Sequence, residues 1–248
     1  MTGEPPPAGA RLAVVDADTE VARCALSLGY RVCFVQRPGA PVEELVDAYA
    51  GLYTVDFGAP HFASFVDRVL GPWNPAAVVS LSDAGVLAAA HATARLGTPG
   101  TRPDVVRRLL SAGADGGRGP VLVGGLTGVP DGLVTVQTLA SLGRHRITGL
   151  CQESGTAPVA GGPAAEPDKE GRQALEGALD AFLRSAGLGA GPACTVVHVS
   201  AGTARIVSSR NHAGERAVRR RLTDTPSDDL LRACLSWPLS AVAEREPR

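Results

Sequence analysis

Residues 12–15 read LAVV and are followed by Asp16. A short run of apolar residues that ends at a polar one is typical of a strand buried on both faces of a parallel sheet. The next apolar residues follow at helical spacing, and Gly29 is a good helix stop: Val21, Cys24, Ala25 and Leu28. This stretch therefore predicts a strand that passes directly into a helix.

The same rhythm continues to about residue 110. Strands are expected at 31–36, 52–57 and 76–82, and helices at 41–50, 61–70 and 83–96. Pro41 suits the first turn of its helix, and Asp83 is expected to cap the last one. Strands that alternate with helices predict an α/β domain with a parallel sheet.

The pattern changes after residue 110. Residues 111–120 form a glycine-rich connector, and residues 121–240 read as an α+β domain with antiparallel strands. Its expected elements are strands at 121–126, 132–140 and 144–153, a helix at 172–188, a hairpin of 194–200 with 204–209, and a helix at 227–239. Residues 1–10 are expected to be a flexible N-terminus.

Composition excludes several classes of protein. The 248 residues carry a net charge of −1, which disfavours nucleic acid and anionic membranes as partners. No apolar run is long enough for a membrane span and the N-terminus is no signal peptide, so a cytoplasmic protein is expected. The five cysteines form no CxxC pair, which argues against a zinc site or a disulfide framework and for buried free thiols.

Nucleotide-binding loops are also missing. The turn after the first strand, DADTEV (16–21), has no glycine and no GxGxxG, so a dinucleotide site there is not expected. Lys169 is the only lysine, the other 23 basic residues being arginine. A GxxxxGK[ST] phosphate loop is therefore impossible.

Four stretches carry a resemblance to a known family. They are VVSLSDAGVLAAAHATARLGTPGTRPDVVRRL (78–109), VLVGGLTG (121–128), LVTVQTLASLGRHRITGL (133–150) and LGAGPACTVVHVSAGTARIVSSRNHAGER (188–216). In this order they resemble the ATP-grasp carboxylate–amine ligases. The resemblance implies a Rossmann-like pre-ATP-grasp domain at 11–110, followed by a truncated ATP-grasp-like domain.

The departures from the family concern ATP. The family places its ATP-clamping subdomain where this chain has only the connector 111–120, which is too short to fold as a subdomain. Against the family pattern, Gly124, Gln137, Val196 and Ser208 stand at positions where glutamates are usual. Magnesium prefers carboxylate and phosphate oxygens, so we expect no metal, no ATP and no other cofactor.

Polar residues remain in the implied cleft. If the two hairpin strands pair as in the family, Ser208, His198 and Arg210 share one face, with Asn211 and His212 at the strand end. We assign catalytic roles to His198, His212 and Glu153, because histidine exchanges protons near neutral pH and a carboxylate can orient it. Candidate substrate-binding residues are Arg210, Asn211, Ser208, Gln137 and Asp83.

Other polar residues receive structural interpretations. Asp16 ends the first strand, where α/β sheets place ligand contacts. We expect His91 to be a packing residue and His145 to be solvated in a turn. The basic run RAVRRRL (216–222) reads as a solvated helix face or as a docking surface for an acidic partner.

Two functions remain open at this point. One is a repurposed enzyme of bacterial natural-product biosynthesis, which binds a small polar or carboxylate-bearing metabolite and catalyses a cyclisation, isomerisation or elimination without ATP. The other is a non-catalytic partner subunit or binding module, as a homodimer or with a pathway protein. A minor alternative is an ATP-dependent ligase completed by a partner.

Overall fold

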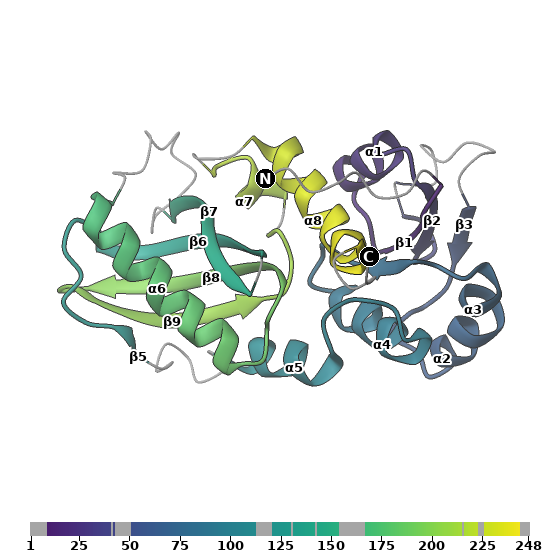
Figure 1. The fold of residues 1–248 in the computed structure, drawn as a ribbon, viewed down its shortest axis with the longest axis horizontal. Coiled ribbons are helices and arrows are strands. Elements are labelled where there is room, and N and C mark those ends of the chain that lie inside the picture. Colours follow the sequence, from purple (N-terminus) through teal and green to yellow (C-terminus); the bar gives the residue numbers. More distant parts are fainter. Residues whose placement is uncertain are drawn as a thin grey trace. The chain divides into compact units, whose positions relative to one another are not determined.

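The computed structural model describes residues 9–40, 42, 51–112, 121–129, 131–141, 143–153, 167–214, 216–222 and 226–243. Most of the expected helix at 41–50, with Pro41, lies outside these residues, as does most of the connector. The contacts divide the chain into two compact units: residues 1–103 with 228–248, and residues 104–227. Figure 1 traces the elements of both units.

The first unit contains the expected parallel sheet. Its strands are β1 (Arg11–Val15), β2 (Arg31–Gln36), β3 (Gly51–Thr54) and β4 (Ala77–Val79). They pair in parallel in the order β3-β2-β1-β4. The chain leaves β1 in one direction and returns to its other side at β4, so the α/β prediction for this region is confirmed.

Among the described residues, six helices accompany this sheet in the first unit. They are α1 (Thr19–Ser27), α2 (Phe62–Phe65), η2 (Val66–Leu70), α3 (Gly71–Trp73), α4 (Val86–Leu96) and α8 (Ser227–Ala243). Asp18 caps α1, its carboxylate accepting from the amides of Glu20 and Val21 at 2.9 and 2.8 Å. Gly29 follows the helix with a φ of +74°, the left-handed geometry that a glycine stop supplies.

Asp83 does not cap α4, which corrects the expectation for this residue. The helix begins after Gly85 with no side-chain cap, and Asp83 is exposed. The Ser82 hydroxyl accepts from the Gly85 amide at 2.9 Å and donates to Asp16 at 2.6 Å. A Cβ on Gly85 would lie 2.5 Å from the Ser80 hydroxyl, so only glycine fits this turn.

The second unit is a five-stranded antiparallel sheet in the order β5-β9-β8-β6-β7. The strands are β5 (Val121–Val123), β6 (Gly132–Ser141), β7 (Arg144–Glu153), β8 (Gly191–Ser200) and β9 (Thr203–Arg210). Its helices are α5 (Pro103–Ser111), α6 (Lys169–Ser185) and α7 (Arg216–Arg219). The expected antiparallel α+β domain is confirmed.

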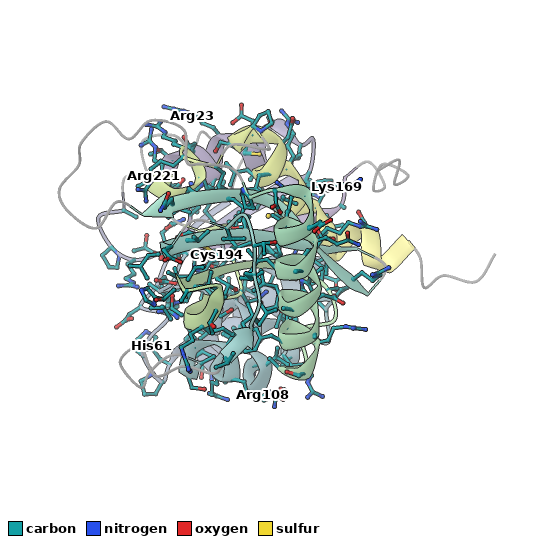
Figure 2. All side chains as sticks on the ribbon, turned by 90° about the vertical axis from the view of Figure 1, so that its left-hand side faces the viewer. Arg23, His61, Arg108, Lys169, Cys194 and Arg221 are labelled. Atoms are coloured by element: carbon teal, nitrogen blue, oxygen red, sulfur yellow. The ribbon has the colours of Figure 1, made fainter. Side chains whose placement is uncertain are left out.

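Helix α6 lies across one face of this sheet (Figure 1). Leu175 and Leu179 pack against Val134, Val197 and other buried strand residues. Seen from the side in Figure 2, α6 runs along the sheet from Lys169 at its start. It begins three residues before the expected Arg172, because Asp168 accepts from the Gly171 amide at 2.7 Å.

Two helices join units other than those expected. Helix α5 packs Val105 and Leu109 against Leu183 and Leu188, so the division falls at 103 rather than at residue 110. Helix α8 belongs with the first unit, where the Tyr30 hydroxyl donates to Ser236 at 3.2 Å. Both helices contact residues far away in the sequence, and local sequence patterns do not reveal such contacts.

Several polar side chains are buried against expectation. Arg219, in the basic run at 216–222, is only 1% exposed and donates to the Gly214 carbonyl at 2.7 Å. His145 is 2% exposed rather than solvated, with a ring nitrogen 2.8 Å from the Leu188 carbonyl. By contrast, all five cysteines are free and buried, as expected, and burial raises the pKa of Cys33 to about 12.

The start of α6 makes a contact that tolerates no side chain at Gly171. A Cβ there would overlap the carbonyl oxygen of Thr127, whereas a Cβ on Gly177 of the same helix would meet nothing within 4 Å. We expect Gly171→Ala to cost about 1–3 kcal/mol of unfolding free energy. We expect Gly177→Ala to add about 0.5–1 kcal/mol. Urea denaturation of both variants checks this, and equal effects would contradict the contact.

Burial lowers the pKa of His145 below its usual value near 6.5, although its contact with the Leu188 carbonyl opposes the shift. The unfolded chain therefore takes up a proton before the folded chain does as the pH falls. We expect the contribution of His145 to the unfolding free energy to be fully present above pH 6.5. Below that pH the contribution should decrease.

The His145→Gln variant should flatten this dependence, because glutamine does not titrate in this range. Urea denaturation from about pH 5 to pH 7.5 measures the slope. The exposed His61 offers a control, since His61→Gln should keep the wild-type slope. An unchanged slope in His145→Gln would show that another group is responsible.

Candidate functional site

The strands β8 and β9 present two faces of different character. Val197 and Val199 point into the core beneath α6. Val196 is half-buried and His198 exposed, and both lie on the opposite face by strand alternation. We call this opposite face the α6-distal face; its residues include Thr135, Gln137, Cys194, Val196, His198, Arg205, Ser208 and Arg210.

The register of the hairpin sets the rows on the α6-distal face. Val196 pairs with Ser208, and Cys194 pairs with Arg210. A bulge interrupts the ladder, because Val197 pairs with Ile206 and leaves one extra residue, Val207. This residue keeps Ser208 and Arg210 on the α6-distal face, as the sequence predicted; regular alternation from Ile206 would have turned both toward α6.

The structure does not bring His198 and Arg210 together. They share the face but lie on opposite sides of the Val196–Ser208 pair. Arg210 lies beside Cys194, four residues along β8 from His198, which is about 13 Å at the rise of a strand. Arg210 instead donates to the carbonyl of Ser209 at 3.1 Å.

The arginine beside His198 is Arg205, which the sequence analysis missed. These two residues pair directly across the ladder, and both are exposed. The signal was present in the turn: Ala201 and Gly202 both have positive φ and form a two-residue loop, so Ser200 faces Thr203. Counting two residues away from the turn along each strand places His198 opposite Arg205.

Asn211 and His212 are embedded in the fold. Asn211 is 7% exposed, and its amide donates to the Pro192 carbonyl at 2.7 Å. His212 is 2% exposed, and its Nδ1 accepts from the Gly214 amide at 2.9 Å. These bonds hold the segment after β9 in place, and both side chains are away from solvent.

Gln137 is fully buried at the centre of the same face. It pairs with Cys194 on one side and Gly149 on the other. Its amide nitrogen donates to the Thr138 carbonyl at 3.0 Å, and its Oε1 accepts no hydrogen bond from the described residues. Leu222 covers this row closely, since a Cβ on Gly149 would lie 2.9 Å from it.

Glu153 and Asp83 occupy different places. Glu153 ends β7 and pairs with Leu133, which pairs in turn with His198, so its backbone lies in the row of His198 and Arg205. Its side chain is outside the described residues. Asp83 belongs to the first unit, in the loop between β4 and α4.

Among the residues that the structure describes, the middle row of the α6-distal face contains no carboxylate. This row contains Val196, Ser208, Thr135 and the buried thiol of Cys151. Within the described ranges, no three His, Cys, Asp or Glu side chains gather into a possible metal site. Nor is any described helix long and apolar enough to cross a membrane.

No protein-family model and no curated protein matches the sequence, but solved structures share its fold. The L-amino acid ligase from Bacillus licheniformis is 14% identical with a TM-score of 0.72, over 94% of this chain and 75% of that one. Glycinamide-RNase-transformylase T from Mycobacterium tuberculosis is 16% identical with a TM-score of 0.65, over 91% and 78%.

N5-carboxyaminoimidazole ribonucleotide synthetase from Thermotoga maritima is 8% identical with a TM-score of 0.64, over 93% of this chain and 76% of that one. These neighbours are ATP-grasp carboxylate–amine ligases. Identities this low establish the fold alone. The resemblance drawn from the four sequence stretches is thus confirmed, and the chain has the fold of the ATP-grasp carboxylate–amine ligases.

Proposed function

We propose that this protein is a repurposed ATP-grasp-like protein that binds a small carboxylate-bearing metabolite on the α6-distal face and acts on it without ATP. The observation that carries the proposal is the pairing of exposed His198 with exposed Arg205. Directly paired residues of an antiparallel ladder have Cβ atoms about 5 Å apart, so one small ligand can reach both side chains.

The two side chains have complementary roles. The guanidinium of Arg205 can hold a carboxylate through two parallel hydrogen bonds. The imidazole of His198 then lies beside the carbon next to that carboxylate, where it can accept a proton from one position and return it to another. Returned to another atom of the same ligand, the proton completes an isomerisation or a cyclisation; delivered to the departing group as its bond to carbon breaks, it completes an elimination.

The neighbouring residues extend this site. Ser208 lies in the next row, and Arg210 offers a second cationic anchor further along the same face. Glu153 stays a proposed catalytic residue, and its backbone lies in the row of His198, with Leu133 between them. Gln137 has an oxygen that accepts no hydrogen bond from the described residues, but its full burial in the row that Leu222 covers suits a buried water there rather than a contact with the ligand. We do not extend the proposed ligand contacts to His212 and Asn211, whose bonds are to the backbone.

The residues on this face are poorly suited to binding ATP with magnesium. Phosphoryl transfer relies on cations and on metal ions held by carboxylates. Valine and serine form the central pair of the face, and the only lysine, Lys169, is the first residue of α6. A composition in which arginine nearly replaces lysine is typical of a high-GC bacterial protein, and the natural-product setting is proposed by analogy alone.

The partner-subunit alternative has one observation in its favour. Val121, on the edge strand β5, is 51% exposed, and edge strands can pair with another chain. The homodimer and the pathway partner belong to this alternative. Size-exclusion chromatography with light scattering separates a monomer from either assembly.

Calorimetric titration with ATP and MgCl₂ tests the first part of the proposal. We expect no saturable heat, because the central pair of the face offers no carboxylate to hold a metal–phosphate complex. Titration of ADP with MgCl₂ serves as the companion measurement. Magnesium-dependent saturation by either nucleotide would contradict ATP independence.

Thermal-shift assays with succinate, citrate and their amides test the ligand class. A carboxylate that raises the melting temperature should lose this effect in Arg205→Ala, with affinity reduced roughly tenfold or more. The His198→Ala variant should still bind most of the carboxylate. It should no longer convert the bound carboxylate, because the role of His198 is proton transfer.

Arg144→Ala is the matched control, since Arg144 is an exposed arginine at the start of β7, far along the sheet from His198. It should bind like the wild type. Equal losses of binding in Arg144→Ala and Arg205→Ala would show that the carboxylate responds to the overall positive charge of the protein. That result would overturn the proposed site.

A further inference from the structure

A cavity of about 680 Å³ lies within the first unit, apart from the proposed site on the second unit's sheet. Its walls come from the loop after β3, from α2 and η2, and from α4. Cavities of a few hundred to a thousand cubic ångströms are the usual size for small-molecule sites. The cavity is therefore large enough for a ligand of moderate size.

Most of the lining is apolar. Phe57, Phe62 and Val66 are buried and Leu87 is half-buried, with alanines between them. The rings of Phe57 and Phe62 meet edge to face at 6.4 Å, and the guanidinium of Arg37 lies 4.7 Å from the centre of the Phe57 ring. These contacts fix the aromatic end of the cavity, so its apolar wall is formed before any ligand arrives.

The charged side of the lining is basic. His91 and Arg95 both line the cavity, and none of the lining residues is Asp or Glu. His91 is exposed on α4, which corrects its expected role as a packing residue. A ligand with an apolar body and a single negative charge would match this distribution.

Arg95 is held in place by a carboxylate outside the lining. Its Nε and Nη2 donate to the two oxygens of Asp67 on η2, which ties this wall of the cavity to α4. These hydrogen bonds lower the pKa of Asp67, so the pair stays ionised at neutral pH. The Nη1 group donates no hydrogen bond to the described residues and remains available to a second anion.

The wall that carries Asp67 has unusual geometry. Residues 66–70 wind as a π-helix between α2 and α3. Such turns are rare and often occur at functional sites. Here the wide turn places Val66 in the lining and Asp67 on Arg95.

We propose that this cavity binds an amphipathic monocarboxylate, an acid with an aliphatic or aryl body of about ten carbons. The body lies against Phe57, Phe62 and Val66, and the carboxylate accepts from Arg95 Nη1 beside His91. This site goes beyond the proposed function and does not depend on it.

Decanoate and decanol are the probes, used below the concentration at which decanoate forms micelles. Calorimetric titration should give saturable binding of decanoate and at least tenfold weaker binding of decanol, because the alcohol lacks the charge. Arg95→Gln should remove this preference. The matched control is Arg68→Gln, which loses an exposed arginine of η2 outside the lining and should keep the preference.

A second pair of variants tests the location. Ala63→Phe places a ring in the lining, whereas Ser64→Phe adds one at the next exposed position of α2, outside the lining. Only Ala63→Phe should weaken the binding of decanoate, by about tenfold or more. Equal effects in both variants, equal affinity for decanoate and decanol, or no binding of decanoate to the wild type would overturn the proposal.

Discussion

The ladder between β8 and β9 contains one extra residue, Val207, and this residue decides which face of the sheet Ser208 and Arg210 occupy. In a regular ladder each residue fixes the face of all that follow, because side chains alternate with a period of two. The bulge shifts that alternation once. It thereby places His198, Arg205, Ser208 and Arg210 on one face while Ala204 and Ile206 stay in the core. Without the extra residue, half of these polar groups would meet the apolar surface of α6.

The core accepts several polar groups because each meets a backbone partner. His145 contacts the Leu188 carbonyl, Asn211 donates to the Pro192 carbonyl, and Arg219 donates to the Gly214 carbonyl. Burial of such groups is costly unless they form hydrogen bonds. Hydrogen bonds to backbone carbonyls therefore help to hold Asn211 and Arg219 in place after β9.

Each unit has its own core and its own chemically distinctive surface. In the first, an apolar cavity is bounded by two helices that an ion pair joins, and its charged lining is basic. In the second, the face of the sheet opposite α6 exposes His198 and Arg205. The two proposals rest on separate residues, so either can fail without the other.

The sequence by itself determined the elements and the fold class. Apolar runs of four to six residues marked the strands, and the spacing at Val21, Cys24, Ala25 and Leu28 marked α1, because these signals are local. The two-residue turn at Ala201–Gly202 also determined that His198 pairs with Arg205. Counting residues outward from the turn would have predicted this pair. The residues Val196 and Ser208, which the sequence analysis set against the family's usual glutamates, pair with each other in the ladder.

Tertiary structure alone decided which polar residues are buried and which are exposed. Arg219 and Arg220 are neighbours in one basic run, yet the first is buried and the second is exposed. The placement of α5 and α8 in units other than those expected, and the cavity beside Arg95, arise from contacts between separate segments of the chain. Local periodicity holds no information about such contacts, because their free energy comes from packing that only the complete fold creates.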